Sequence, residues 1–228
     1  ALMFEFLEKY WLPLLFNMIV AYLIGGINSS IVATKFLGIK EDIRNLGSGN
    51  AGFTNALRTM GKKVAILAFV GDFTKGVLAV FLGIRIASMD YITDSSLLTI
   101  KIFAYTAALM CVLGHVYPCF FGFRGGKGIL TAWASSLLID WRVFLILITV
   151  FLIVFACTKV VSIASICAAM SFPIASFIVS YLTAPTAEVI VSVVFSFVMG
   201  LIVIIKHKSN IIRILNGTEK KISVNKVN

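Results

Sequence analysis

Two cations lie within one glycine-rich stretch, Gly122-Phe123-Arg124-Gly125-Gly126-Lys127-Gly128. Glycine has no Cβ, so backbone N–H groups in such a turn can converge on an anion. A helix that begins near Gly128 would add the positive end of its dipole. The stretch therefore indicates a phosphate-binding turn at which Arg124 and Lys127 act with the glycine amides. A tight connection between two helices, without a ligand, is the alternative.

A second glycine-rich stretch, residues 47–58, reads Gly-Ser-Gly-Asn-Ala-Gly-Phe-Thr-Asn-Ala-Leu-Arg. It contains G-x-G-x-x-G, but a dinucleotide site also needs a preceding strand and a βαβ unit, which the surrounding sequence does not support. A helix starting near Gly52 would place Asn55 and Arg58 on one face. Arginine suits bidentate contacts to phosphate. The stretch indicates an anion-binding loop, with a solvated turn as the alternative.

Other polar residues lie within or beside apolar runs. His207 and Asn210 would share a face if the last helix continues by one turn, although a basic patch beside the membrane is equally simple. His115 is either a proton carrier or a hydrogen-bonded structural residue. Asp72 and Lys75 lie one helical turn apart, where charges are costly unless paired. They form either a structural ion pair or part of a substrate cavity.

The sequence lacks the residues that several other kinds of chemistry require. The glycine turn is not a Walker A loop, because Phe121 stands where the first glycine is required and Gly128 where Ser or Thr is required. The sequence shows no recognisable nucleophile setting, acid pair or metal-ligand spacing. The cations, amides and hydroxyls instead suit binding of multiply anionic molecules, with catalysis by proximity and charge stabilisation.

The composition determines where these residues must work. Of 228 residues, 60% are hydrophobic and 13% charged, and the mean hydropathy is +1.01. A soluble domain has about 25% charged residues, so the chain is an integral membrane protein. Its apolar runs are long and continuous, which favours helices over a barrel. The net charge of +10 sits between the runs, where it indicates topology and anionic ligands rather than nucleic acid.

The apolar runs predict an all-α protein with seven transmembrane helices, at residues 11–34, 64–86, 102–121, 129–139, 143–156, 160–182 and 189–205. Two short helices in the middle are separated by Asp140-Trp141-Arg142, and one long helix over residues 129–156 is the alternative. Residues 35–63 and 206–228 each hold six Lys and Arg. Only seven helices place both segments on one side of the membrane.

The positive-inside rule assigns that side to the cytoplasm, with the N-terminus outside. Residues 1–205 would then form one catalytic domain, and residues 206–228, including Lys226, a basic cytoplasmic tail. Both glycine-rich stretches and His207 would share the cytoplasmic face.

Four sets of residues together resemble the bacterial acyl-phosphate:glycerol-3-phosphate acyltransferases, the PlsY family. They occur in the family's order and span nearly the whole chain: Gly47-Ser48-Gly49-Asn50-x-Gly52-x-Thr54-Asn55-x-x-Arg58, Asp72-x-x-Lys75-Gly76, Gly114-His115-x-Tyr117-Pro118 with residues 123–128, and His207-x-x-Asn210. Phe53 and Tyr117 depart from the Ala and Phe that are usual there.

The resemblance implies transfer of a fatty acyl group from acyl phosphate, rather than acyl-CoA or acyl carrier protein, to the 1-hydroxyl of sn-glycerol 3-phosphate. The products would be lysophosphatidic acid and phosphate. It implies a monomer in the bacterial cytoplasmic membrane, in contact with lipid, without metal, cofactor, nucleic acid or covalent acyl-enzyme. The implied catalytic residues are Ser48, Arg58, Lys127, His207 and Asn210, and the implied substrate-binding residues are Gly47, Asn50, Asn55, His115, Arg124, Gly125, Gly126 and Gly128.

Two other classes of function compete with this one. A transporter for phosphorylated anions should bind near the membrane midplane, where only Asp72 and Lys75 are charged. A purely structural membrane subunit leaves the polar residues of the 47–58 stretch unexplained.

Overall fold

The computed structural model describes residues 2–93 and 96–221; Lys226 lies outside this part. Every regular element described is a helix. The elements in chain order are α1 (Leu2–Gly26), α2 (Ser29–Phe36), η1 (Ile43–Asn45), α3 (Phe53–Thr59), α4 (Lys62–Ala87), α5 (Leu97–Val116), η2 (Cys119–Phe121), α6 (Ile129–Ile139), α7 (Trp141–Thr158), α8 (Val161–Thr183), α9 (Thr186–Lys206) and α10 (Lys208–Leu215).

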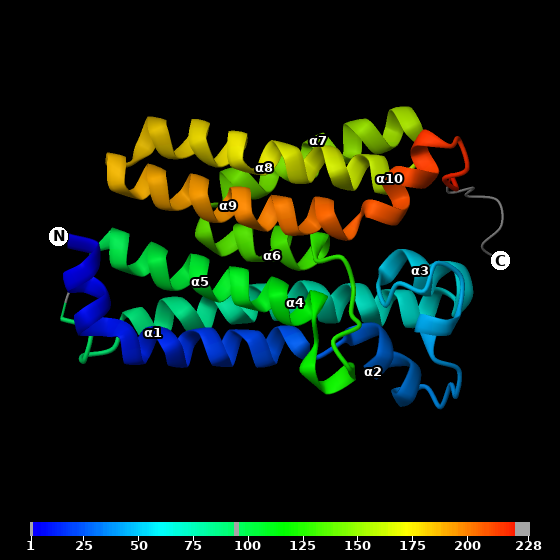
Figure 1. The fold of residues 1–228 in the computed structure, drawn as a ribbon, viewed down its shortest axis with the longest axis horizontal. Coiled ribbons are helices and arrows are strands. Elements are labelled where there is room, and N and C mark those ends of the chain that lie inside the picture. Colours follow the sequence, from blue (N-terminus) through cyan, green and yellow to red (C-terminus); the bar gives the residue numbers. More distant parts are fainter. Residues whose placement is uncertain (1, 94–95, 222–228) are drawn as a thin grey trace.

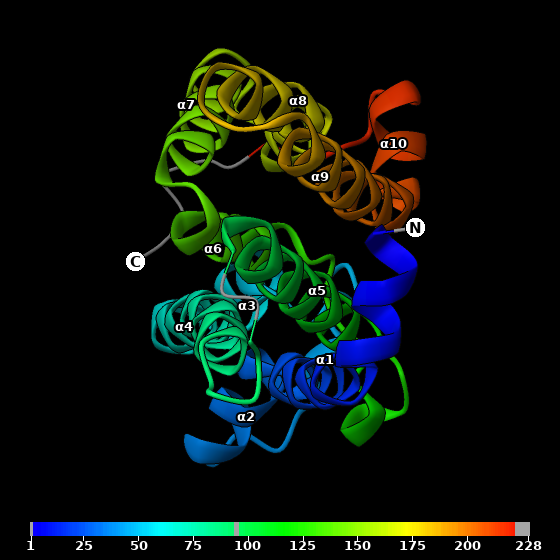
Figure 2. The ribbon, with the colours of Figure 1, turned by 90° about the vertical axis from the view of Figure 1, so that its left-hand side faces the viewer.

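Six of these helices, α1, α4, α5, α7, α8 and α9, are long and apolar enough to cross a membrane, and α6 is a shorter apolar helix. They lie side by side along the long axis of the molecule (Figure 1). Figure 2 shows α6 between the α4 and α5 side of the bundle and the α7, α8 and α9 side. The predicted all-helical membrane fold, with seven apolar helices, is confirmed.

The two ends of the bundle differ in what they carry. The start of α1 lies at one end, and α2, α3 and α10 lie at the other (Figure 1). The helices that flank the first glycine-rich stretch and follow α9 are therefore gathered at a single end.

The first helix differs from its predicted bounds. We expected residues 11–34, whereas α1 ends at Gly26 and a separate α2 follows. Asn28 causes the break, because its side-chain oxygen accepts the N–H of Ile31 at 3.1 Å and caps α2. α1 also begins earlier than expected and is kinked at Tyr10, where φ is −118° and ψ is 15°.

The predicted interruption near residue 140 is confirmed. Asp140 caps α7: its carboxylate accepts the Arg142 N–H at 3.0 Å and pairs with the Arg142 guanidinium at 2.7 Å. The helix then runs to Thr158 and ends at Lys159, whose φ of 58° is left-handed. With 18 residues, α7 is longer than the expected 143–156, so α6, with 11 residues, is the short helix of the pair.

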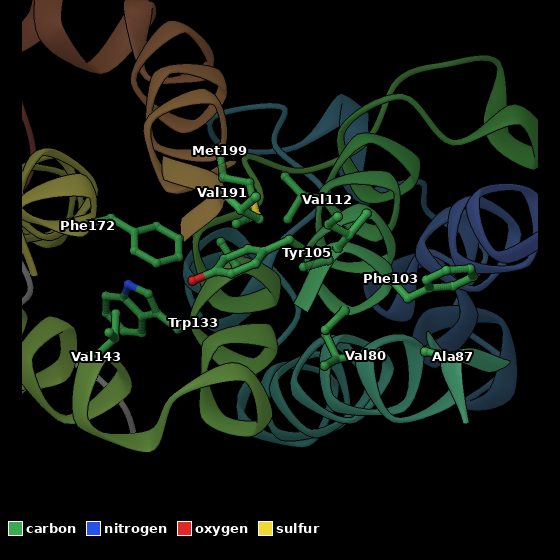
Figure 3. Close-up of a cluster of buried hydrophobic side chains, with 14 of the residues drawn as sticks. Val80, Ala87, Phe103, Tyr105, Val112, Trp133, Val143, Phe172, Val191 and Met199 are labelled. Atoms are coloured by element: carbon green, nitrogen blue, oxygen red, sulfur yellow. The ribbon is translucent and has the colours of Figure 1, made fainter. Parts of the chain in front are cut away.

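The core lies where α5, α6, α8 and α9 meet. Figure 3 shows Tyr105, Trp133, Phe172 and Met199 converging there from these four helices. Trp133 also packs edge-on against Phe151 of α7, with ring centroids 4.7 Å apart. This packing fixes the short α6, and therefore the glycine turn that leads into it.

Candidate active site

A cavity of about 280 Å³ is built by α3, the start of α6 and the segment around α10. Its polar lining comes from segments far apart in the chain: Ser48, Asn50, Thr54, Asn55, Arg58, Asp72, His115, Lys127, Ser162, Ser165, His207, Asn210, Arg213 and Glu219. Its apolar lining includes Phe53, Phe69, Leu130, Trp133, Phe151 and Phe155. One cavity therefore joins a polar, cation-bearing part to an aromatic wall.

Most of the residues expected in the site line this cavity: Ser48, Asn50, Asn55, Arg58, His115, Lys127, Gly128, His207 and Asn210. Four others do not belong to the described lining: Gly47, Arg124, Gly125 and Gly126. Arg124 is exposed. The structure thus brings both glycine-rich stretches and α10 together at the cavity, but part of each stretch lies outside the cavity lining.

Asn55 is committed to shaping the first loop. Its Oδ1 accepts the Ser48 N–H at 3.0 Å, and its Nδ2 donates to the carbonyl oxygens of Ile43 and Leu46 at 3.2 and 2.9 Å. Gly47 has a φ of 58°, and a Cβ there would lie 2.4 Å from Asn55 Oδ1. Asn55 and Gly47 therefore hold Ser48 in place, and substrate binding by these two residues stays a prediction.

Two amides of the glycine turn are likewise occupied. Gly125 N–H donates to the Val116 carbonyl at 3.3 Å, and Gly126 N–H donates to the His115 carbonyl at 3.1 Å. These bonds fasten the turn to the end of α5, so in this conformation neither amide is free for a phosphate. The expected helix start is confirmed, because Gly128, with a φ of 84°, caps α6. Only the Lys127–Gly128 end of the turn faces the cavity.

Lys127 is the cation of that end. Its Nζ donates to Asn210 Oδ1, which links the glycine turn to α10. Burial lowers the pKa of Lys127 to about 8, and the nearby Glu219 carboxylate opposes this shift while Arg213 and Arg58 add to it. Lys127 is therefore a cation at neutral pH, but one with a weaker hold on its proton than a lysine in water.

His207 is buried at the junction of α9 and α10. Its Nδ1 lies 2.7 Å from the Val203 carbonyl oxygen, which can only accept, so Nδ1 carries the hydrogen. Burial, and after it the nearby Lys127, lowers the pKa of His207 to about 4. The ring is neutral at pH 7, and its Nε2 is an unprotonated acceptor.

Ser162, Arg213 and Glu219 were not predicted. Glu219 Oε1 accepts the Ser162 hydroxyl and the Asn210 amide, each at 2.7 Å, and Oε2 pairs with Arg213 Nε at 2.6 Å. His207, Asn210 and Arg213 are spaced by three residues each, so the helical spacing in the sequence could have predicted Arg213. Ser162 and Glu219 follow no such spacing, since they meet only through the fold.

The residues after α10 close over the first loop. Arg58 Nη2 donates to the Lys220 carbonyl at 3.2 Å. Because Glu219 holds Asn210 and Lys220 contacts Arg58, the described residues of the expected tail, 206–221, help to build the cavity.

The aromatic wall continues away from the cavity. Phe53 packs edge-on against Phe69, with centroids 5.6 Å apart, and Phe69 stacks on Phe73 at 6.3 Å. Phe69, which lines the cavity, is 42% exposed.

The bundle and the cavity together define an integral membrane protein with a cation-bearing cavity beside an apolar wall. Sequence comparison specifies the class further. The family model described as "Glycerol-3-phosphate acyltransferase" matches residues 15–217. The chain belongs to the glycerol-3-phosphate acyltransferase family.

Individual relatives cover nearly the whole chain. The glycerol-3-phosphate acyltransferase of Clostridioides difficile (strain 630) is 39% identical over 212 residues, which cover 91% of this chain and 95% of the relative. That of Aquifex aeolicus (strain VF5) is 40% identical over 208 residues, covering 91% and 98%.

The crystal structure of PlsY (YgiH), an integral membrane glycerol 3-phosphate acyltransferase in its glycerol 3-phosphate form, is similar with a TM-score of 0.75. It is 36% identical, and the match covers 92% of this chain and 96% of that one. The lysophosphatidic acid form of PlsY matches with the same TM-score at 34% identity, covering 94% and 97%.

Proposed function

We propose that this acyltransferase moves a fatty acyl group from an acyl phosphate to the 1-hydroxyl of sn-glycerol 3-phosphate, giving lysophosphatidic acid and inorganic phosphate. The observation that carries the proposal is a single cavity whose lining combines Arg58, Lys127 and Arg213 with an aromatic wall. Two phosphorylated substrates that repel each other need several cations, and a fatty chain needs the wall.

The choice of acyl phosphate as donor rests on the motifs that resemble those of acyl-phosphate-using enzymes. The choice of glycerol 3-phosphate as acceptor rests on the similarity to glycerol-3-phosphate acyltransferases. An acyl phosphate carries its own leaving group, so no covalent acyl-enzyme is required. In the described part of the chain, none of the four cysteines lines the cavity. Direct attack by the glycerol hydroxyl on the acyl carbonyl is the simplest reaction for this set of residues.

The transfer step can be assigned to named groups. The 1-hydroxyl oxygen bonds to the acyl carbon. The bond between the acyl carbon and the bridging oxygen of the phosphate breaks, and the hydroxyl proton ends on the departing phosphate. Lys127 and Arg58 stabilise the charge that develops on this phosphate. Neutral His207 accepts a hydrogen bond from the hydroxyl at Nε2 and orients it. With a pKa of about 4, His207 is too weak a base to retain the proton.

Ser48 and Asn210 complete the positioning of the substrates. Asn55 fixes the backbone at Ser48, and Glu219 fixes the amide of Asn210, whose Oδ1 faces Lys127. Every group named comes from one chain, so a monomer suffices. We place the cavity on the cytoplasmic face of the bacterial inner membrane, because the basic segments lie around it. The reaction would then make a lysophospholipid where phospholipid synthesis begins.

The test uses purified protein in lipid with glycerol 3-phosphate and either palmitoyl phosphate or palmitoyl-CoA, following lysophosphatidic acid and released phosphate. We expect equal amounts of both products from palmitoyl phosphate, and none from palmitoyl-CoA. Lysophosphatidic acid from palmitoyl-CoA alone would overturn the donor. Activity no higher than that of a Lys127→Ala variant would overturn the proposed role of the cavity.

An Arg58 series in the same assay tests the electrostatic part of the mechanism. Arg58→Ala should cost about 2–4 kcal/mol of transition-state stabilisation, the usual cost of removing one such contact. Arg58→Lys keeps the charge but loses the planar fork, and should retain more activity. A rate near that of the unmodified protein for Arg58→Ala would remove Arg58 from the site.

A further inference from the structure

Three ionisable side chains form a buried cluster at the wall of the cavity, and two of them, Asp72 and His115, belong to its lining. Asp72, Lys75 and His115 are 3%, 6% and 4% exposed. Lys75 Nζ lies 2.9 Å from Asp72 Oδ1 and 2.9 Å from His115 Nδ1. Its third partner is the carbonyl oxygen of Ile27, at 2.8 Å, in the break between α1 and α2. The cluster therefore joins α4, α5 and that break.

The hydrogen-bonding capacity of Lys75 determines the state of His115. An ammonium group has three N–H donors and no acceptor, and Lys75 has three partners. Two of these contacts are hydrogen bonds, to Ile27 and His115, and the third is the ion pair with Asp72. His115 Nδ1 must accept from Lys75, which places the hydrogen of the neutral ring on Nε2. Asp72 Oδ1 lies 3.5 Å from Nδ1 and 2.9 Å from the Lys75 ammonium that both groups face.

The Nε2 side of this ring lies directly against the glycine turn. A Cβ built on Gly126 would lie 2.1 Å from His115 Nε2 and 2.7 Å from Cε1. The backbone of His115 accepts the Gly126 N–H as well. The ring and the main chain of one residue thus determine how close Gly126, and with it Lys127, can come to α5.

The same cluster also reaches the first loop. Ile27, which accepts from Lys75, precedes Asn28, and Asn28 Nδ2 donates to the Ala51 carbonyl at 3.4 Å. The Ala51 carbonyl oxygen would be 3.2 Å from a Cβ on Gly126. The two glycine-rich segments therefore touch beside the His115 ring, and both are tied to Lys75.

We propose that Asp72, Lys75 and His115 are positioning residues for the acyl transfer. Together they hold the His115 ring as a spacer that fixes the glycine turn against the first loop, and so fix Lys127 relative to Arg58. The inference rests on the proposed function, since the cluster would position the two cations, Lys127 and Arg58, that the function requires. The cluster acts on Lys127 through Gly126.

A pair of substitutions tests the spacer. Gly126→Ala adds a methyl group that collides with the ring, and a displacement of Lys127 by about 1 Å lowers kcat/KM for glycerol 3-phosphate by about 100-fold. His115→Ala removes the ring and lowers kcat/KM as well. In the double variant the methyl group occupies the vacated space, so its activity should exceed the product of the two single effects by about tenfold.

Gly125→Ala is the matched control. A Cβ on Gly125 would lie 2.0 Å from the backbone oxygen of His115 and 2.7 Å from Pro118 Cδ. Truncating the His115 side chain removes neither contact, so Gly125→Ala and His115→Ala should combine as a simple product, within about twofold. Simple products for both pairs would overturn the spacer. Failure of the unmodified protein to exceed Lys127→Ala would instead overturn the proposed function.

A spectroscopic measurement covers the case in which the variants do not fold. The chain has two histidines, and the structure gives them opposite tautomers: hydrogen on Nε2 in His115 and on Nδ1 in His207. Solid-state NMR of ¹⁵N-histidine-labelled protein in lipid should show one of each at pH 7, assigned with a His207→Gln variant. A Nδ1–H or imidazolium signal for His115 would overturn the proposal.

Discussion

Lys127 carries its charge in a partly buried place, beside Arg58 and Arg213. Its pKa is lowered to about 8 chiefly by burial. The cation is thus present below about pH 8 and is lost as the pH rises through that value. A phosphate bound beside it favours the charged form, so the pKa should rise when substrate binds.

This gives a pH prediction. We expect kcat/KM, which reports the free enzyme, to fall above about pH 8, and kcat to fall only at higher pH. In Lys127→Arg the residual activity should lose this alkaline fall, because arginine stays charged throughout that range. Initial rates corrected for non-enzymatic hydrolysis of palmitoyl phosphate measure both profiles. An unchanged alkaline limb in Lys127→Arg would show that another group titrates.

At the scale of the elements, α1 and α5 pack backbone against backbone. A Cβ on Gly25 would lie 2.1 Å from the Cys111 carbonyl oxygen, and one on Gly114 would lie 2.2 Å from that of Tyr22. Small residues allow membrane helices to approach this closely. The contact matters for the site because His115, one residue after Gly114, holds the glycine turn.

The close contact predicts a difference between two adjacent glycines. Gly25→Ala should destabilise the protein by about 1–3 kcal/mol, because the methyl group meets backbone that cannot rotate away. Gly26→Ala is the control: its Cβ would lie 3.4 Å from the ring of Phe120, an ordinary contact. Thermal unfolding in detergent measures both variants. Equal melting temperatures would argue against the tight approach of α1 and α5.

At the scale of the whole molecule, seven apolar helices place the N-terminus and the α10 end on opposite sides of the bundle (Figure 1). The positive-inside rule then predicts which side is cytoplasmic. Trp141 and Thr218 are both exposed, at the start of α7 and just after α10. They are suitable reporters for the two membrane faces.

Labelling of intact cells with a membrane-impermeant maleimide tests this topology. Trp141→Cys should react in intact cells, and Thr218→Cys only after the cells are opened. The background variant lacks the four native cysteines, Cys111, Cys119, Cys157 and Cys167. Reaction of both positions from the same side would contradict the seven-helix crossing.

Much of this protein is predictable from its sequence, because the deciding effects are local. Runs of apolar residues predict helices that satisfy their own backbone, and Asp140 marks a helix start by capping. Glycine-rich stretches with Ser48, Arg58 and Lys127 indicate phosphate chemistry from residue type and spacing alone. The family resemblance adds the order of the motifs.

Only the tertiary structure decides which of these groups are free to act. The amides of Gly125 and Gly126 and the side chain of Asn55 have the right chemistry, but carbonyl and amide groups elsewhere in the fold already occupy them. Glu219 and Ser162 carry no local pattern, yet they meet in the cavity. A hydrogen bond depends on the directions of two groups that folding brings together, and spacing along the chain does not contain those directions.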